Sequence, residues 1–283
     1  MSRALTSGPI NTDSLRSWYR KSRFYIRHRS ENENVFHCTV HKSASQWIRQ
    51  MASDERVYRY GGLSSYQYTE AMPGKFDPRK ITQRAFDKRF PSRTFVTPLY
   101  IDYNNFSNIP KHSSYKVFFV MRDPRDVLVS WYFSTKYSHD LLGDQAKIRQ
   151  ELNRLDVTDG LLYGIDFLDQ FGLFKAQRSW ADASQDTVML VRYEELVAAD
   201  NFGVFKRLFD HCDIRIPADL LKELLQDNSF ERLSGGRQRG EENKKASYRK
   251  GVHGDWKNYF NGKLEQRFAE ATDDLLTAWG YES

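Results

Sequence analysis

One stretch of the chain, residues 35–51 (VFHCTVHKSASQWIRQM), limits the possible folds more than any other. Its first six residues are mostly β-branched or apolar and are followed directly by a polar break, which is the pattern of a short buried strand. After the break, Trp47, Ile48 and Met51 recur at helical spacing. The stretch therefore predicts a strand, a tight turn and a helix.

The turn, residues 41–45, has the character of an anion site. In a strand-turn-helix unit, backbone N–H groups and the positive end of the helix dipole face the turn, and Lys42, Ser43 and Ser45 add donors there. The turn is not a Walker A loop, because no glycine precedes the lysine. Taken alone, the stretch fits two interpretations, a phosphate site or an ordinary strand-to-helix turn with exposed serines.

The rest of the chain alternates strand and helix patterns. We expect strands at 94–97, 117–121 and 187–191, and helices at 168–180, 194–211, 217–226 and 264–279, with a further helix beginning at Asp123 and Pro124. This alternation predicts an α/β fold with a central parallel β-sheet flanked by helices. We expect a basic N-terminal arm at 1–30 and a single domain at 31–283, with a mobile loop at about 234–250.

The composition narrows the function classes. A net charge of +6 favours polyanionic partners such as nucleotides, nucleic acid, a membrane surface or sulfated and phosphorylated products. Cys38 and Cys212 lie far apart, so the sequence encodes neither a disulfide framework nor a zinc cluster, and no metal is expected. Signal-peptide patterns and apolar runs of about 18 residues are absent from the sequence, so we expect a soluble, cytoplasmic protein without stable membrane association.

Three later segments add candidate binding residues. Arg122 ends the strand at 117–121, and Ser130 lies about two helical turns further on, so both are expected to border one crevice and form a second anion site. Tyr193 follows the strand at 187–191 and fits either a base pocket or a cap on the core. Arg249 and Lys250 stand beside Gly251, which would let the backbone approach a ligand closely.

Three motifs resemble one known family. HKSASQW is similar to PKSGTTW, the 5′-phosphosulfate loop of the cytosolic-type sulfotransferases, and MRDPRDVLVSWYF resembles their 3′-phosphate motif RNPKDVAVSYYHF. RKGVHGDWKNYF resembles their RKGxxGDWKNxF signature. The motifs occur in the family's order over roughly residues 35–260.

This resemblance implies a P-loop-like sulfotransferase fold and a donor, 3′-phosphoadenosine 5′-phosphosulfate (PAPS), that leaves as adenosine 3′,5′-bisphosphate (PAP). It assigns Lys42 and Ser130 to catalysis as well as to donor binding. The other donor residues that it implies are His41, Ser43, Ala44, Ser45 and Gln46 around the 5′-phosphate, Trp47, Tyr193 and Phe230 around adenine, and Arg122, Arg249, Lys250 and Gly251 at the 3′-phosphate. Sulfuryl transfer through a loose in-line transition state asks the protein mainly to position reactants and stabilise charge.

The sequence also departs from the family. Ala44 replaces the loop glycine, Gln46 replaces a threonine and His41 replaces a proline, while the family's general-base histidine in KTHLP has no counterpart in FVTPLYIDYNNF. Asp102 is our first candidate for the base, with His112 and His41 as further candidates. The family's dimer segment is altered at residues 261 and 262, so we expect a monomer or weak dimer.

The acceptor is expected to be a small hydroxyl or amine compound, cationic or aromatic, and not a nucleic acid. The residues that favour such an acceptor are Tyr58, Tyr60, Tyr66, Tyr68 and Phe76 as an aromatic wall, and Asp102, Asp77 and Glu70 as negative charges. Two other function classes fit parts of the sequence. One is an ATP-dependent small-molecule kinase of related architecture, and the other is a non-catalytic basic protein that binds nucleic acid or acidic lipid.

Overall fold

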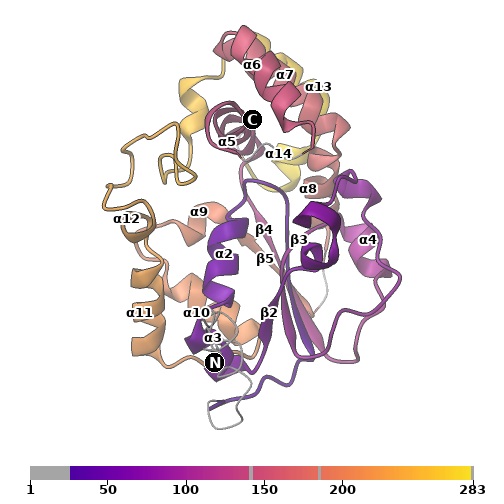
Figure 1. Cartoon of the computed structure of the whole chain (residues 1–283), viewed down its shortest axis with the longest axis vertical. Coiled ribbons are helices and arrows are strands. Elements are labelled where there is room, and N and C mark those ends of the chain that lie inside the picture. Colours follow the sequence, from indigo (N-terminus) through magenta and orange to yellow (C-terminus); the bar gives the residue numbers. More distant parts are fainter. Residues whose placement is uncertain (1–25, 140–142, 184–185, 282–283) are drawn as a thin grey trace, which may run out of the picture.

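The computed structural model describes residues 26–139, 143–183 and 186–281, and within them five parallel strands form one sheet (Figure 1). The strands are β1 (Asn34–Thr39), β2 (Ser64–Tyr66), β3 (Thr94–Tyr100), β4 (Tyr115–Met121) and β5 (Val188–Arg192), in the order β2-β3-β1-β4-β5. β1 lies between β3 and β4. β2 and β3 therefore lie on one side of β1, and the later strands β4 and β5 lie on the other. Such a switch in direction opens a crevice at the carboxyl ends of the strands.

The two faces of the sheet carry separate hydrophobic cores, because successive side chains point to opposite faces of a strand. Val35 and Phe118 belong to one core, and their neighbours Phe36 and Phe119 belong to the other. β1 is buried along its whole length, as expected for a central strand covered on both faces. The expected α/β fold with a parallel sheet is confirmed.

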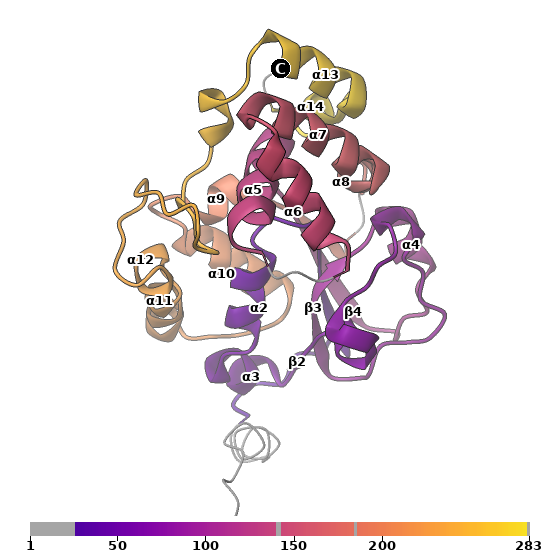
Figure 2. The ribbon, with the colours of Figure 1, turned by 45° about the horizontal axis from the view of Figure 1, so that its top comes forward.

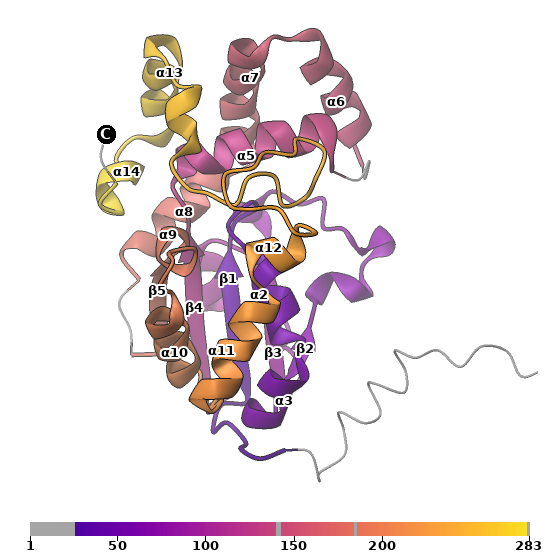
Figure 3. The same cartoon turned by 90° about the vertical axis from the view of Figure 1, so that its left-hand side faces the viewer.

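Helices cover both faces and one end of the sheet. The helices on the Val35 face are α2 (Ser45–Ala52), α3 (Glu55–Gly61), α10 (Phe202–His211) and α11 (Ala218–Asp227) (Figure 1). The remaining longer helices are α4 (Tyr103–Asn108), α5 (Pro124–Tyr137), α6 (Gln145–Arg154), α7 (Val157–Gln170), α8 (Leu173–Ala181) and α13 (Gly262–Thr272). Figures 2 and 3 show α5, α6, α7 and α13 gathered over the end of the sheet where β4 runs into α5.

Short elements complete the described chain. The short α-helices are α9 (Tyr193–Leu196), α12 (Phe230–Leu233) and α14 (Leu275–Ala278). The 3₁₀ turns are η1 (Tyr68–Ala71), η2 (Pro73–Lys75), η3 (Ile81–Gln83) and η4 (Asp255–Asn258). Within the described residues, none of the helices combines the length and apolar character that crossing a membrane requires.

The structure divides three of the expected helices and adds elements that the sequence did not predict, among them α3 and β2. The helix expected at 168–180 is broken at Gly172, whose φ of +78° is left-handed and where a Cβ would lie 2.7 Å from Thr82 Oγ1. The helices expected at 194–211 and 264–279 are divided in the same way, the latter at Asp273 with φ of +50°. α3 and β2 lie between residues 52 and 93, for which no helix or strand was expected. The missed signal for α3 is Asp54, whose carboxylate caps the helix by accepting the Arg56 N–H.

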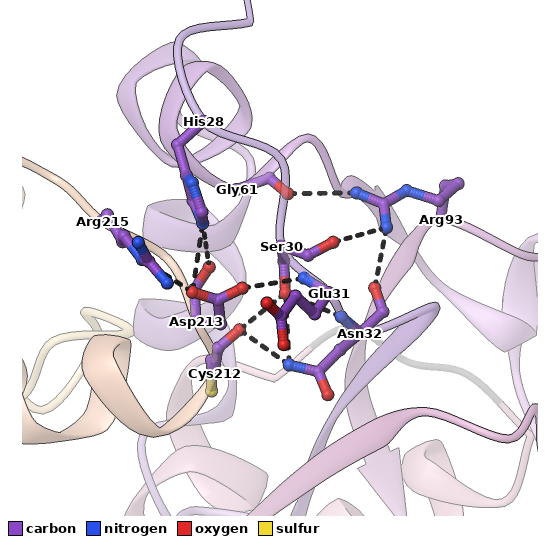
Figure 4. A network of polar contacts seen from close by, with 9 residues as sticks. All are labelled: His28, Ser30, Glu31, Asn32, Gly61, Arg93, Cys212, Asp213 and Arg215. Carbon is purple, nitrogen blue, oxygen red and sulfur yellow. Dashed lines mark hydrogen bonds and ion pairs between the residues drawn. The ribbon is translucent and has the colours of Figure 1, made fainter.

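Figure 4 shows how the first described residues are fixed at the amino end of the sheet. The Asp213 carboxylate accepts the Glu31 N–H at 2.7 Å and lies 3.1 Å from His28 Nε2. The Ser30 hydroxyl donates to the Cys212 carbonyl at 3.0 Å. These contacts join the start of the described chain to the turn between α10 and α11. Most of the arm expected at 1–30 lies outside the described residues, and the mobility expected for 234–250 stays a prediction.

Candidate active site

The carboxyl ends of the strands meet at a cavity of about 220 Å³. The residues predicted from the sequence that line it are His41, Lys42, Ala44, Ser45, Gln46, Trp47, Arg122, Ser130, Tyr193, Phe230, Arg249, Lys250 and Gly251. They come from the turn after β1, the end of β4, helix α5, the residue after β5 and two late segments. The structure therefore brings together five separate parts of the chain that the sequence assigned to one ligand, counting Arg122 and Ser130 as one part.

The turn after β1 is held in an unusual backbone conformation. Lys42 and Ala44 have φ angles of +69° and +62°, in the left-handed region. The first N–H groups of α2 face this turn without partners inside the helix. The Ser43 hydroxyl is fully buried and has no hydrogen-bond partner in the part of the chain that is described. Ser43 itself does not line the cavity, so an anion there would accept from the backbone N–H groups at the start of α2.

Positive charge dominates the cavity. Burial, together with the neighbouring Arg122 and Arg249, lowers the pKa of Lys42 to about 8. Arg122 donates to the Lys42 carbonyl at 2.9 Å, and its guanidinium lies 4.4 Å from the centre of the Tyr193 ring. Among the described residues that line the cavity, none is an aspartate or glutamate. The site is therefore built for a strongly anionic ligand.

The late cationic pair is fixed by two carboxylates. Lys250 Nζ lies 2.6 Å from Asp255 Oδ1, and Arg249 pairs with the same aspartate. Burial alone would raise the pKa of Asp255, but the hydrogen bonds from Lys250 and Arg249 hold it below its usual range. Asp126 on α5 accepts the N–H groups of Gly254 at 2.6 Å and Trp256 at 3.0 Å. These bonds place the late segment beside the end of β4.

Aromatic side chains line the same cavity as the cations. Trp47 Nε1 donates to the Asn228 carbonyl at 2.8 Å, and its ring meets Phe205 edge to face. Phe230 packs directly against Gly251, where a Cβ would lie 2.3 Å from the phenyl ring. With Tyr193 above Arg122, these rings give the cavity flat apolar walls suited to a planar base.

Comparison with known proteins identifies the family. The sulfotransferase domain family matches residues 25–280. This chain belongs to the sulfotransferase family. Sulfotransferase 2A1 of Rattus norvegicus is 25% identical over 61% of this chain and 63% of its own length. A flavonol sulfotransferase-like protein of Flaveria bidentis is 23% identical over 89% of this chain and 84% of its own length.

Solved structures show the same fold. Mouse sulfotransferase SULT7A1, complexed with PAP, is 19% identical with a TM-score of 0.61, and the match covers 90% of this chain and 91% of the mouse chain. Retinol dehydratase in a complex with retinol and PAP gives a TM-score of 0.54 at 14% identity, over 92% of this chain and 86% of that chain. The expected enzyme class, a sulfotransferase, is confirmed, and the kinase alternative finds no support.

The first two candidates for the general base do not lie in the cavity of this sulfotransferase. Asp102 is buried as the N-cap of α4, where its carboxylate accepts the Asn105 N–H at 2.9 Å. His112 precedes β4, at the amino end of the sheet, with Nε2 3.2 Å from the Phe90 carbonyl. Both assignments are corrected by this placement, because a base must reach the reacting hydroxyl. His41, the third candidate, lines the cavity.

The acceptor wall expected from the sequence also lies elsewhere. Every residue that was expected to favour the acceptor lies outside the cavity lining, namely Tyr58, Tyr60, Tyr66, Tyr68, Phe76, Asp77, Asp102 and Glu70. Asp77 is buried and pairs with Arg79 at 2.8 Å and with Arg84 at 3.5 Å. These two arginines balance its negative charge, so it is not available to a cationic acceptor. The sequence interpretation missed lining residues instead, namely Tyr100, His139, Val197, Asn228, Leu233, Arg239, Ser247, Tyr248 and Val252.

Ala44 offers a test of strain in the turn of the sulfotransferase. A Cβ in the left-handed region costs about 1–2 kcal/mol, whereas glycine adopts this region freely. After the extra chain entropy of glycine is subtracted, Ala44→Gly is expected to raise the free energy of unfolding by about 0.5–1 kcal/mol, measured by urea titration. Ala269→Gly, on the exposed face of α13, should lower it by about 1 kcal/mol. Equal destabilisation by both variants would contradict the strain.

Proposed function

We propose that the cavity binds PAPS and that the enzyme transfers its sulfuryl group to a hydroxyl of a small-molecule acceptor. The observation that carries this proposal is that the Lys42 turn, the Arg249–Lys250 pair and the aromatic rings of Trp47, Tyr193 and Phe230 all line one cavity. A nucleotide with phosphates at both ends of its ribose needs this arrangement. The solved sulfotransferases of the same fold carry PAP.

The described residues divide the work of binding and catalysis. Lys42, with the N–H groups at the start of α2, would hold the 5′ end of the donor and stabilise the charge that grows on the leaving phosphate. Arg122, Ser130 and the Arg249–Lys250 pair would hold the 3′-phosphate through charge-assisted hydrogen bonds. Bound PAPS supplies an activated sulfuryl group, so the protein itself needs no covalent step.

We further propose a neutral acceptor with an aromatic or apolar body. Tyr100 and His41 line the cavity, and Phe171 lies 5.6 Å from the His41 ring, whereas no described lining residue is acidic. A cationic acceptor would meet Lys42 and lack a counter-charge. Relatives named as a 3-beta-hydroxysteroid sulfotransferase and a flavonol 3-sulfotransferase are named for neutral hydroxyl compounds.

The cellular setting and assembly are proposals of the same kind. Cys38 and Cys212 are both free and buried, which agrees with a reducing cytoplasm. Asn261, one of the two altered residues of the family's dimer segment, caps α13 by accepting the Leu264 N–H. This residue therefore stabilises a helix of its own chain. We therefore propose a cytoplasmic enzyme that acts as a monomer or weak dimer.

Binding of PAP and AMP tests the donor site, because the two nucleotides differ in the 3′-phosphate. If the charge-assisted hydrogen bonds to the 3′-phosphate contribute about 2 kcal/mol, PAP should bind about 30-fold more tightly than AMP, as measured by calorimetry at fixed salt. Arg249→Ala should remove most of this difference, whereas Arg154→Ala, which deletes an exposed arginine on α6, should keep it. Equal affinity for both nucleotides, with tight salt-dependent binding of long polyanions, would instead support the nucleic-acid alternative.

A further inference from the structure

The sequence assigned His41 both to the 5′-phosphate of the donor and to the candidate bases, and the contacts of its ring favour the second role. His41 follows β1 directly, lines the cavity and precedes Lys42 in the chain. Its imidazole stacks on the Tyr100 ring with centroids 4.0 Å apart, and Phe171 lies 5.6 Å from it. The Tyr100 hydroxyl donates to Ser45 Oγ at 2.9 Å, so the stacked pair is joined to the turn. Within the described chain the His41 ring makes no hydrogen bond, which leaves both nitrogens available to a ligand.

Other histidines near the centre of the sheet are less well placed. His37 is fully buried inside β1, where Nδ1 lies 2.8 Å from Thr97 Oγ1. His139 also lines the cavity, but it is an exposed residue beyond the end of α5. His41 alone among these three is both held rigidly by packing and adjacent to Lys42.

We propose that His41 is the general base that accepts the proton of the acceptor hydroxyl, and this inference rests on the proposed function. In the step, the bond between sulfur and the bridging oxygen of the donor breaks, and its electron pair stays on the 5′-phosphate of PAP. A new bond forms between sulfur and the acceptor oxygen, whose proton passes to a ring nitrogen of His41 and later to water. Tyr100 is a positioning residue, because its ring fixes the plane of the imidazole.

The surrounding charges keep His41 ready to accept a proton. Burial lowers the pKa of His41 well below its ordinary value, and the positive charges of Arg84, Lys42 and His139 lower it further. Tyr100, the other titratable group packed on the ring, has its pKa raised by burial and stays neutral. The imidazole is therefore uncharged at neutral pH. Acceptor turnover is expected to fall as the pH drops below the pKa of His41, which lies under 6.5.

The test compares acceptors of different acidity in full-length wild-type and His41→Gln enzymes. With an unactivated phenol as acceptor, the variant should lose about 100-fold in kcat, because proton removal is then needed. With 4-nitrophenol, which is largely ionised near neutral pH, the loss should shrink to a few-fold. Added imidazole should restore activity to His41→Ala. The low-pH decline of wild type should disappear in His41→Gln, while the decline above about pH 8 from Lys42 should remain.

Controls separate this inference from the donor assignment. PAP should bind His41→Gln within a few-fold of wild type, and His112→Gln, at the amino end of the sheet, should match wild type with both phenols. Equal losses for both phenols, or no rescue by imidazole, would overturn His41 as base while leaving the donor site intact. Failure of wild type and all variants to bind PAP would overturn the proposed function itself.

Discussion

Lys42→Ala is expected to lower turnover by at least about 10³-fold, because the variant loses the cation nearest to the charge that grows on the leaving phosphate. PAP should still bind within about tenfold of wild type, since Arg122, Ser130 and the Arg249–Lys250 pair would continue to hold the 3′-phosphate. The measurements are single-turnover sulfuryl transfer and calorimetric PAP binding. Loss of rate with retained binding would show that Lys42 acts on the transition state.

Lys116→Ala is a matched control for Lys42→Ala. Lys116 lies near the amino end of β4, where its Nζ donates to the Asp186 carbonyl at 2.8 Å, so the variant loses a lysine charge far from the cavity. It should keep full activity. Full activity in Lys42→Ala would contradict the proposed role of this lysine in the transition state. A loss of PAP affinity equal to the loss of rate would show that Lys42 acts in binding alone.

The donor site could be predicted from sequence because its parts are short and local. The turn at 41–47 reads as strand, polar break and helix, and Asp123 and Pro124 mark the start of α5 after Arg122. Lys42 and Arg122 therefore fall at the carboxyl ends of predicted strands, and parallel strands bring those ends to one edge.

The acceptor side could not be predicted in the same way. The predicted strand stopped at residue 97, whereas β3 continues through Pro98 to Tyr100. This hid Tyr100 at the true carboxyl end of β3, and with it the surface on which His41 stacks. Two signals were present and not used. Asp102 begins a helix as its N-cap, so its carboxylate is engaged by that helix, and His112 precedes a strand, which places it at the amino end of the sheet.

Gly251→Ala is expected to weaken PAP binding by about 5- to 150-fold, since forcing atoms into a packed site costs about 1–3 kcal/mol. An added Cβ would lie 2.3 Å from Phe230 Cδ2. The Arg237 guanidinium lies 5.4 Å from the centre of the Phe230 ring and limits how far the ring can move. The substitution must therefore shift either the wall that Phe230 forms or the backbone that carries Lys250.

Gly254→Ala separates this collision from backbone strain. Gly254 has φ of +75°, close to the +68° of Gly251, but a Cβ there would meet no atom within 4 Å. Both variants should lose about 1 kcal/mol of stability through the left-handed φ, measured by urea unfolding. Only Gly251→Ala should lose PAP affinity, measured by calorimetry. If both lose it equally, strain at either glycine is enough to disturb the ligand. If neither does, Phe230 and Gly251 move apart without disturbing the ligand, and the contact between them does not shape the 3′-phosphate end of the cavity.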